Sequence, residues 1–399
     1  MNIHGVKILA AALAGLVIAA PAYSVERTVD VAGFGAKSGA IRLFGMNAEA
    51  ALNAAADAIN AAGGVKLGDG ATGKIKVTYY DDRCNAEEGI SVVRRIAATD
   101  AIIGVGPSCS NVAESAFGIL QKKVGDASDS GLQFPIFADV ASKVGLAGIS
   151  EWSFRNVPNE LEMYKSLFGW VKQQYPDLKT LYGGVEVDFA HSKATFGAMK
   201  GQAEANGFNV LGTSEWLLND TAFSNQVRDM RRAQPDIVAI SAHPITTCGV
   251  LREMERQQVK PKLLIGLTSS STLETLKGCA KQAQGLLIPT GFAPINNQAR
   301  TAAEQIAAKG GSADLHSAAS YEIMFYLKDI IESQGVMAKP ETVEEDRRKM
   351  RAGMAALDET RGLLGAVKRT ADREAIKPFV FVQARGDHWE MVHNPAVAK

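Results

Sequence analysis

The sequence lacks an excess of charge of either sign, because 43 Lys and Arg residues balance 43 Asp and Glu residues. This balance gives no electrostatic footprint for nucleic acid and no reason to expect an anionic membrane as a partner. Proline is sparse, with 13 residues spread over 399, and charged residues make up 22%. The composition therefore excludes collagen-like, low-complexity and disordered chains. The length leaves room for two or three domains.

Long apolar runs are missing from the chain after its N-terminal segment. No stretch there approaches the roughly 18 uncharged apolar residues that span a membrane. The first 24 residues have the organisation of a cleaved export signal. Lys7 provides the positive charge, Ile8–Ala20 forms a short apolar core, and Ala22-Tyr23-Ser24 is a small-residue cleavage site. No cysteine follows this core, so we expect no lipid anchor. The pattern indicates an exported protein in an oxidising compartment.

Cysteine is scarce, and the four residues are Cys84, Cys109, Cys248 and Cys279. In an oxidising compartment an even number favours disulfides, and four cysteines allow three pairings. No C-x-x-C pair or nearby histidine completes a metal-ligand set. We therefore expect no metal site, and the spacing alone does not choose among the pairings.

From residue 27 onward, short apolar runs rich in β-branched residues alternate with amphipathic or Ala-rich stretches, which predicts βα units and mostly parallel sheets. A first series contains strands at Val29–Phe34, Ile75–Tyr79, Ala101–Val105 and Phe134–Ala138, with helices at Asn47–Ala62, Glu87–Thr99 and Val112–Val124. A second series contains strands at Thr180–Val185, Val210–Trp216, Asp236–Ser241, Leu263–Leu267 and Leu286–Thr290, with helices at Leu161–Gln174, Ser192–Asn206, Phe223–Ala233, Cys248–Gln257 and Ser271–Lys281. The two series predict two consecutive doubly wound halves.

The remainder of the chain predicts helices at Ala299–Lys309, Leu315–Gln334 and Glu341–Thr360, and then a final strand at Pro378–Gln383. Three helices without intervening strands cannot build a third sheet, so we expect them to pack on the first half while the last strand joins the second. The expected organisation is a signal segment (1–24), a first lobe (25–158 plus 292–360) and a second lobe (159–291 plus 361–399). The lobes should therefore be joined by more than one crossing.

Enzyme signatures are incomplete. The segment Ala32–Ser38 is similar to a phosphate loop, but Ala36 stands where the glycine before the lysine is needed. The G-x-G sequences at 33–35 and 104–106 each lack the third glycine of a dinucleotide fingerprint. We interpret these segments as loops or strands and expect no cofactor.

Small hydroxyl-bearing clusters recur directly after an apolar strand and before a helix. They are Ser108-Cys109-Ser110, Ser142, Thr246-Thr247 and Thr268–Thr272. In an open α/β sheet, ligands bind outside the carboxyl ends of the strands, where free N–H groups of the next helix favour anions. Any one cluster taken alone is more typical of a helix cap. Because clusters occur in both halves, we expect a carboxylate-binding cleft between them.

Four motifs occur in this order: Gly33–Gly39, Tyr80–Asn85, Gly104–Ser110 and Phe154–Asn156. Together with the export signal they resemble the leucine/isoleucine/valine-binding protein family, the periplasmic substrate-binding proteins of ABC importers. The resemblance covers nearly the whole chain after the signal. It implies an α/β fold of two doubly wound, Rossmann-like lobes (a type I periplasmic binding protein), three crossovers, a ligand in the interlobe cleft and closure by hinge bending.

The resemblance also implies roles for individual residues. Cys84 and Cys109 match a family disulfide, whereas a Cys248–Cys279 pair has no family support and two buried thiols are an equal alternative. The matching ligand-binding positions are Ser110 for the carboxylate, Val140 and Ser142 in the next loop, Phe44 and Phe189 as aromatics of the two lobes, and His243 near a family tyrosine. Core packing is the alternative for both phenylalanines, and loop structure for His243. Arg155 at the lobe crossing is expected to stabilise the hinge.

One position departs from the family pattern. The family's amino-acid receptors place an acid for the ligand ammonium where this sequence has Thr268. An unpaired buried ammonium costs several kcal/mol, so an amino acid would need Glu186 or Asp188 instead. Alternatively, the ligand is an aromatic or aliphatic carboxylic acid held by Arg42, for which a solvated surface charge is the competing interpretation.

We therefore expect a monomeric, non-enzymatic component of an ABC importer in the periplasm. It would capture a hydrophobic or branched-chain amino acid, or an aromatic acid, and deliver it to a membrane permease. The alternatives are an exported hydrolase that uses Ser110 with His243, and a ligand sensor for a signalling receptor. Turnover of candidate esters would favour the hydrolase.

Overall fold

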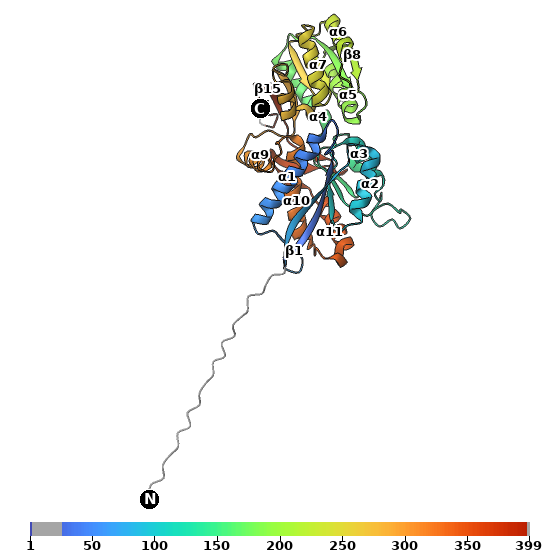
Figure 1. Ribbon diagram of the computed structural model, residues 1–399, viewed down its shortest axis with the longest axis vertical. Coiled ribbons are helices and arrows are strands. Elements are labelled where there is room, and N and C mark those ends of the chain that lie inside the picture. Colours follow the sequence, from blue (N-terminus) through green and yellow to red (C-terminus); the bar gives the residue numbers. More distant parts are fainter. Residues whose placement is uncertain (2–25, 397–399) are drawn as a thin grey trace.

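The computed structural model describes Met1 and residues 26–396. Apart from Met1, the expected export signal lies outside the described residues. The described chain forms two α/β lobes stacked end to end (Figure 1). Over these residues no helix has both the length and the apolar character required to cross a membrane.

The first lobe is built on a six-stranded sheet with the order β2-β3-β1-β4-β5-β6. Its strands are β1 (Glu26–Gly35), β2 (Val65–Lys66), β3 (Thr72–Asp81), β4 (Ile103–Val105), β5 (Ile136–Ala138) and β6 (Ser153–Arg155). All pairs are parallel except β2 with β3. Alternation along β1 sends Val29 and Val31 to one face of the sheet and Ala32 and Phe34 into the core cluster on the other. Helices therefore cover both faces.

The helices of the first lobe come from two separate parts of the chain. The N-terminal ones are α1 (Arg42–Ala61), α2 (Ala86–Ala97) and α3 (Ser110–Gly118). The later ones are α9 (Asn297–Ala308), α10 (Leu315–Gln334) and α11 (Val343–Ala355), preceded by a short 3₁₀ turn, η3 (Pro340–Thr342). Both α9 and α10 pack on α1, and α11 packs on α10 (Figure 1). The predicted return of these three helices to the first half is confirmed.

The second lobe is built on a seven-stranded sheet with the order β16-β15-β11-β10-β9-β7-β8. Its strands are β7 (Thr180–Glu186), β8 (Asn209–Trp216), β9 (Ile237–Ser241), β10 (Leu263–Gly266), β11 (Leu286–Thr290), β15 (Val380–Arg385) and β16 (His388–His393). Its helices are α4 (Glu160–Gln174), α5 (Ala190–Ala205), α6 (Ser224–Ala233), α7 (Pro244–Arg256), α8 (Leu273–Cys279) and a 3₁₀ turn, η2 (Thr268–Ser270). The strands β7 to β11 are parallel, and β15 joins β11 antiparallel. The predicted addition of the late strand to the second sheet is confirmed.

The chain crosses between the lobes three times, after β6, after β11 and after α11. The third crossing carries a small sheet of β12 (Glu359–Gly362), β13 (Gly365–Arg369) and β14 (Ala375–Ile376). Just after it, Lys377 forms an ion pair with Glu322 of α10, and both side chains are only 2% exposed. Asn156 at the first crossing donates to the same Glu322 carboxylate, at 3.0 Å. One buried carboxylate therefore ties two crossings to the first lobe.

Arg155 also lies at the first crossing, and its guanidinium is buried. Its Nε donates to the carbonyl oxygen of Ala141 at 2.7 Å, and its Nη1 pairs with Glu374 of the third crossing. These contacts agree with the expected role of Arg155 in stabilising the crossings.

Some expected elements are wrong at their ends. The predicted helix Val112–Val124 ends at Gly118, because Leu120 turns into a bridge with Leu132 and the Lys122 ammonium binds the free carbonyls of the last turn. The predicted helix Glu341–Thr360 ends at Ala355, since the following residues form β12.

Six strands are missing from the prediction: β2, β6, β12, β13, β14 and β16. The strand β6 pairs parallel with β5, although its three residues are too few to show a period. The strand Pro378–Gln383 is not final, because β16 follows and pairs antiparallel with β15. A 3₁₀ turn, η1 (Leu146–Ile149), precedes β6.

Candidate functional site

A pocket lies between the lobes, at the carboxyl ends of the strands of both sheets. The first lobe contributes Phe44, Ser108, Cys109, Ser110, Asn111, Val140, Leu315 and His316, and the second contributes Glu160, Phe189, His191, His243, Thr268 and Ser269. The free volume is about 20 Å³, which is room for little more than one water molecule. The residues of the two lobes thus form two opposing walls that almost touch.

The first-lobe wall is centred on the start of α3. The residue before the helix, Cys109, makes no side-chain cap, so the N–H groups of the first turn are not bound by its side chain. The Ser110 hydroxyl accepts the Lys143 N–H at 3.1 Å, which leaves its proton available to a ligand. Cys109 is bonded to Cys84, with the Cα atoms 5.7 Å apart. Free N–H groups at a helix start, next to a hydroxyl, favour a carboxylate.

Asp139 holds the two loops of this wall together. Its Oδ2 accepts from the Ser108 hydroxyl at 3.1 Å and from the Ser320 hydroxyl of α10 at 2.8 Å. Its Oδ1 accepts the Val140 N–H at 2.7 Å. Burial raises the pKa of Asp139, against the effect of these hydrogen bonds. The first wall therefore rests on a buried carboxyl group that does not line the pocket.

The second-lobe wall presents the carboxylate of Glu160, the first residue of α4. The side chain is buried and interacts with three donors: His191 Nε2 lies 2.9 Å from Oε1, and the hydroxyls of Thr268 and Thr195 donate to the two oxygens. Burial by itself raises the pKa of Glu160, but the charge of His191 and these hydrogen bonds outweigh it and lower the pKa overall. Glu160 is therefore ionised at neutral pH. It places a negative charge beside Thr268, where the family pattern has an acid.

His243 lies next to this carboxylate on the same wall. It is the residue before α7, and its Nδ1 lies 2.5 Å from Glu186 Oε1. The second oxygen of Glu186 accepts from the Thr246 hydroxyl at 2.7 Å. Burial alone raises the pKa of Glu186, but the His243 charge and hydrogen bonds outweigh it and lower the pKa. Both carboxylate oxygens of Glu186 are thus hydrogen-bonded behind the wall.

The structure brings neither expected ammonium partner into the pocket. Glu186 is buried behind His243, and Asp188 is exposed and accepts the Leu218 N–H at 3.0 Å. The physical reason is that both residues satisfy local donors of the second lobe. Glu160, which the sequence prediction did not single out, occupies that place.

The expected aromatic residues of the two lobes do meet in the pocket. Phe44 stacks on His316 with the ring centroids 4.0 Å apart, and it lies 5.9 Å from His243. Phe189 meets His243 edge-on at 4.9 Å. Four rings therefore surround the space in which a ligand side chain would lie.

The remaining predicted residues divide into two groups. Ser110, Val140 and Thr268 line the pocket, as expected from their positions after strands. Ser142 is buried away from the pocket, and in the described structure its hydroxyl has no hydrogen-bond partner. Arg42 is exposed at the start of α1 and does not line the pocket either.

Three titratable pocket residues were missed by sequence reasoning: Glu160, His191 and His316. Each lies in the first turn of a helix, at the start of α4, α5 or α10. Hydroxyl clusters after strands do not mark these positions. A list of polar first-turn residues of all helices that begin at the cleft would have included them.

Comparison with known proteins decides the family. A family model described as periplasmic binding protein matches residues 28–388. The chain belongs to the periplasmic binding protein family. The match spans both lobes and all three crossings.

Solved structures similar to this periplasmic binding protein share its whole architecture. They include a leucine-binding protein, LivK, from Thermotoga maritima, with a TM-score of 0.78, 16% identity, and coverage of 93% of this chain and 100% of that one. The branched-chain amino acid transporter substrate-binding protein LivJ from Streptococcus pneumoniae, in complex with isoleucine, has a TM-score of 0.77 at 16% identity over 91% and 98%. A solute-binding protein from R. palustris, in complex with 4-hydroxybenzoate, has a TM-score of 0.76 at 17% identity over 92% and 96%. These likenesses establish the type I periplasmic binding protein fold.

Proposed function

We propose that this chain is the substrate-binding component of an ABC importer. In the periplasm it captures a small carboxylate between its lobes by hinge closure and delivers it to a membrane permease. Family membership supports the class of function, and the pocket shared by both lobes supports the mechanism. The observation that carries the proposal is the opposition of the two walls: Ser110 and the free start of α3 face the Glu160 carboxylate.

The first ligand candidate is a hydrophobic or branched-chain amino acid. A zwitterion complements this pocket, because its carboxylate fits the N–H groups of α3 and its ammonium fits Glu160. The apolar side chain then lies among the rings of Phe44 and Phe189. Glu160 thus replaces the acid that the family pattern places at Thr268.

The second candidate is an aromatic acid, and the four rings of the pocket favour it. A flat ring packs well against Phe44, His316, Phe189 and His243. In this case Glu160 keeps its partners His191, Thr195 and Thr268 and does not touch the ligand.

The free space of about 20 Å³ requires the lobes to separate before a ligand can bind. Separation pivots on the three crossings. A ligand that contacts both walls then stabilises the closed form, because it binds this form better than the open one. We keep the lobe boundaries 25–158 plus 292–360 and 159–291 plus 361–399 as part of this proposal, with one cleft per chain and a monomer as the functional unit.

A binding panel tests the proposal. Leucine, isoleucine, valine and phenylalanine are compared with 4-methylpentanoate, benzoate and 4-hydroxybenzoate by thermal shift and calorimetry. A true ligand at 100 times its Kd adds about 2.7 kcal/mol to the free energy of unfolding. If no compound in the panel stabilises the protein, the proposed function is wrong.

The variant Glu160→Gln separates the two ligand candidates. If the ligand is an amino acid, we expect the wild type to reject 4-methylpentanoate and the variant to bind leucine about 100-fold more weakly, which is roughly 2.7 kcal/mol. If the wild type binds benzoates and the variant binds them equally well, the aromatic acid is the ligand.

The hydrolase alternative has one supporting observation, since His243 pairs with Glu186 as a catalytic histidine pairs with an acid. The Ser110 hydroxyl, however, belongs to the opposite lobe and binds the Lys143 N–H. In the described structure no serine hydroxyl is hydrogen-bonded to the His243 ring. We therefore propose binding without catalysis, and a burst of product from p-nitrophenyl esters would contradict it.

A further inference from the structure

Two segments of the second-lobe wall follow neighbouring strands of the sheet. His243 follows β9 and precedes α7, while Thr268 and Ser269 follow β10 and precede α8. The loops must keep a fixed spacing if one ligand is to contact both. The hydrogen bonds and the disulfide behind the wall show how this spacing is held.

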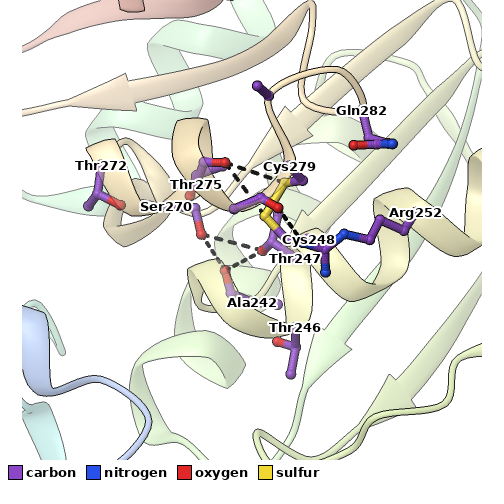
Figure 2. Close-up of a disulfide and its surroundings, with 12 residues drawn as sticks. Ala242, Thr246, Thr247, Cys248, Arg252, Ser270, Thr272, Thr275, Cys279 and Gln282 are labelled. Atoms are coloured by element: carbon purple, nitrogen blue, oxygen red, sulfur yellow. Dashed lines mark hydrogen bonds between the residues drawn. A yellow bond between two sulfur atoms is a disulfide. The ribbon is translucent and has the colours of Figure 1, made fainter. Parts of the chain in front are cut away.

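A shared carbonyl joins the two segments directly. The oxygen of Ala242, the residue before His243, accepts from the Thr247 hydroxyl at 2.9 Å and from the Ser270 hydroxyl at 2.7 Å. The two hydroxyl oxygens are 3.4 Å apart. Figure 2 shows this triangle of oxygens beside the disulfide. The loop before α7 and the turn before α8 therefore share one hydrogen-bond centre.

The Cys248–Cys279 disulfide lies directly behind that centre and joins α7 near its start to the last residue of α8 (Figure 2). The Cα atoms are 5.4 Å apart, and each cysteine is only 3% exposed. Both sulfur atoms lie near the Thr275 carbonyl oxygen, at 3.6 and 3.4 Å. A Cβ at Gly278 would be 3.2 Å from Cys248 Sγ, so the glycine permits this close approach.

The start of α7 has no side-chain cap to fix it. His243 makes no cap hydrogen bond, because its ring is bound to Glu186, and Pro244 supplies no N–H. The direction of α7, and with it the position of the His243 ring, therefore depends on contacts from neighbouring elements. These contacts are the hydrogen bonds of Glu186 with the His243 ring and the Thr246 hydroxyl, and the covalent link from Cys248 to α8.

We propose that Cys248–Cys279 is a positioning device for the second-lobe wall. It holds His243 and Thr268 at the spacing that a bound ligand requires, so the loops need not be ordered at the moment of binding. The part of this inference that concerns ligand affinity rests on the proposed function. A disulfide that only stabilised the fold would affect unfolding and leave the wall unchanged.

The test compares the double variant Cys248→Ala/Cys279→Ala with a control of similar stability loss. Phe208→Ala is suitable, because Phe208 is buried in the other core cluster of the second lobe, against Phe168. Both changes are expected to lower the stability of the fold by similar amounts. The unliganded proteins are studied well below their unfolding temperatures, by amide hydrogen exchange and by NMR of the histidine rings.

We expect the amides of residues 242–243, 245–247 and 268–272 to exchange at least tenfold faster in the disulfide variant and the His243 signals to shift. The control should show neither change. Equal changes in both variants, or no change in the disulfide variant, would overturn the inference. This measurement needs no ligand, so it decides the inference even if the binding panel fails.

The second measurement uses whichever panel compound binds the wild type. We expect affinity at least tenfold weaker in the disulfide variant and within threefold of wild type in Phe208→Ala. Equal losses in the two variants would show that the disulfide acts on stability alone.

Discussion

The buried carboxyl groups behind the two walls of the pocket behave in opposite ways. Behind the first wall, Asp82 and Asp139 accept hydrogen bonds from neutral donors and take part in no ion pair within the described chain, and burial raises the pKa of each. On the second wall, Glu160 and Glu186 each face a histidine, and the pKa of each is lowered although burial opposes this.

The difference assigns a separate task to each lobe. Burial raises the pKa of both acids behind the first wall, and the N–H groups and hydroxyls of this wall favour an anion. On the second wall the pKa of Glu160 is lowered, so its carboxylate supplies a negative charge to the pocket. Under the proposed function, we therefore expect the first lobe to bind the ligand carboxylate and the second lobe to discriminate among carboxylates.

The largest effect should come from breaking an ion pair on the second wall. Glu186→Ala leaves His243 and Thr246 without their buried partner. We expect a loss of about 3–5 kcal/mol in the free energy of unfolding, measured with urea, because an orphaned buried polar partner is costly. Asp188→Ala, two residues away and exposed, should cost less than about 1 kcal/mol. Similar losses in the two variants would contradict the paired role of Glu186.

The second effect concerns a scaffold acid behind the first wall. Burial raises the pKa of Asp82 to about 7, although the Cys84 N–H donates to it at 2.8 Å. Because the pKa is higher in the folded than in the unfolded state, Asp82 reduces stability progressively as the pH rises from about 4 to 7.

The variant Asp82→Asn removes this penalty and keeps the acceptor oxygen. We expect it to be about 2–4 kcal/mol more stable than wild type at pH 8, with the difference shrinking toward pH 4. Denaturant titrations across this range measure the effect. If the free energies of unfolding of variant and wild type depend on pH in the same way, the pKa of Asp82 is not raised in the folded state.

Glu160 is expected to affect the pH dependence of stability in the direction opposite to Asp82. Its pKa is lowered in the folded state, so its contribution to stability is complete above its ordinary pKa and is lost as the pH falls through the folded value. In Glu160→Gln this acid-dependent loss disappears. Melting temperatures between pH 6 and pH 3 should therefore fall about 2 °C less in the variant than in wild type. A larger fall in the variant would reverse the contrast between the walls.

The smallest effect lies at the mouth of the cleft. Glu274 of α8 lines a separate interlobe cavity of about 210 Å³ beside Leu43 and Phe44, and burial raises its pKa while the Arg42 charge across the mouth opposes this. We expect Arg42→Glu to weaken ligand binding two- to fivefold and the swap Arg42→Glu/Glu274→Arg to restore it. Calorimetry on Arg42→Glu, Glu274→Arg and the double variant measures the coupling between the two side chains. If the losses of affinity in the single variants add up in the double variant, the two side chains are not coupled.

Much of the fold followed from apolar runs. The strand β9 is buried over its whole length, as expected for a parallel strand covered on both faces, and its residues predict a strand directly. The return of the late helices to the first lobe followed from the absence of strands between them. By contrast, β12 is polar and only four residues long, so its pattern does not differ from that of a loop.

The two walls differed in how well the sequence predicted them. Ser110 and Val140 follow strands, and the family resemblance marked them. Glu160 was missed because an acid in the first turn of a helix is favoured by the helix dipole wherever the helix lies. Only its three-dimensional neighbours, His191 and Thr268, distinguish it from an ordinary acid at a helix start.

The late strands have a consequence for how the molecule is assembled from its chain. The edge of β11 receives its antiparallel partner, β15, from a segment that follows all the helices of the first lobe. A chain truncated after α11 leaves β11 as an open edge, a template for aggregation. The second lobe therefore cannot complete its sheet until the chain has been synthesised past α11, the last helix of the first lobe. By that time most of the sequence of the second lobe has already been synthesised.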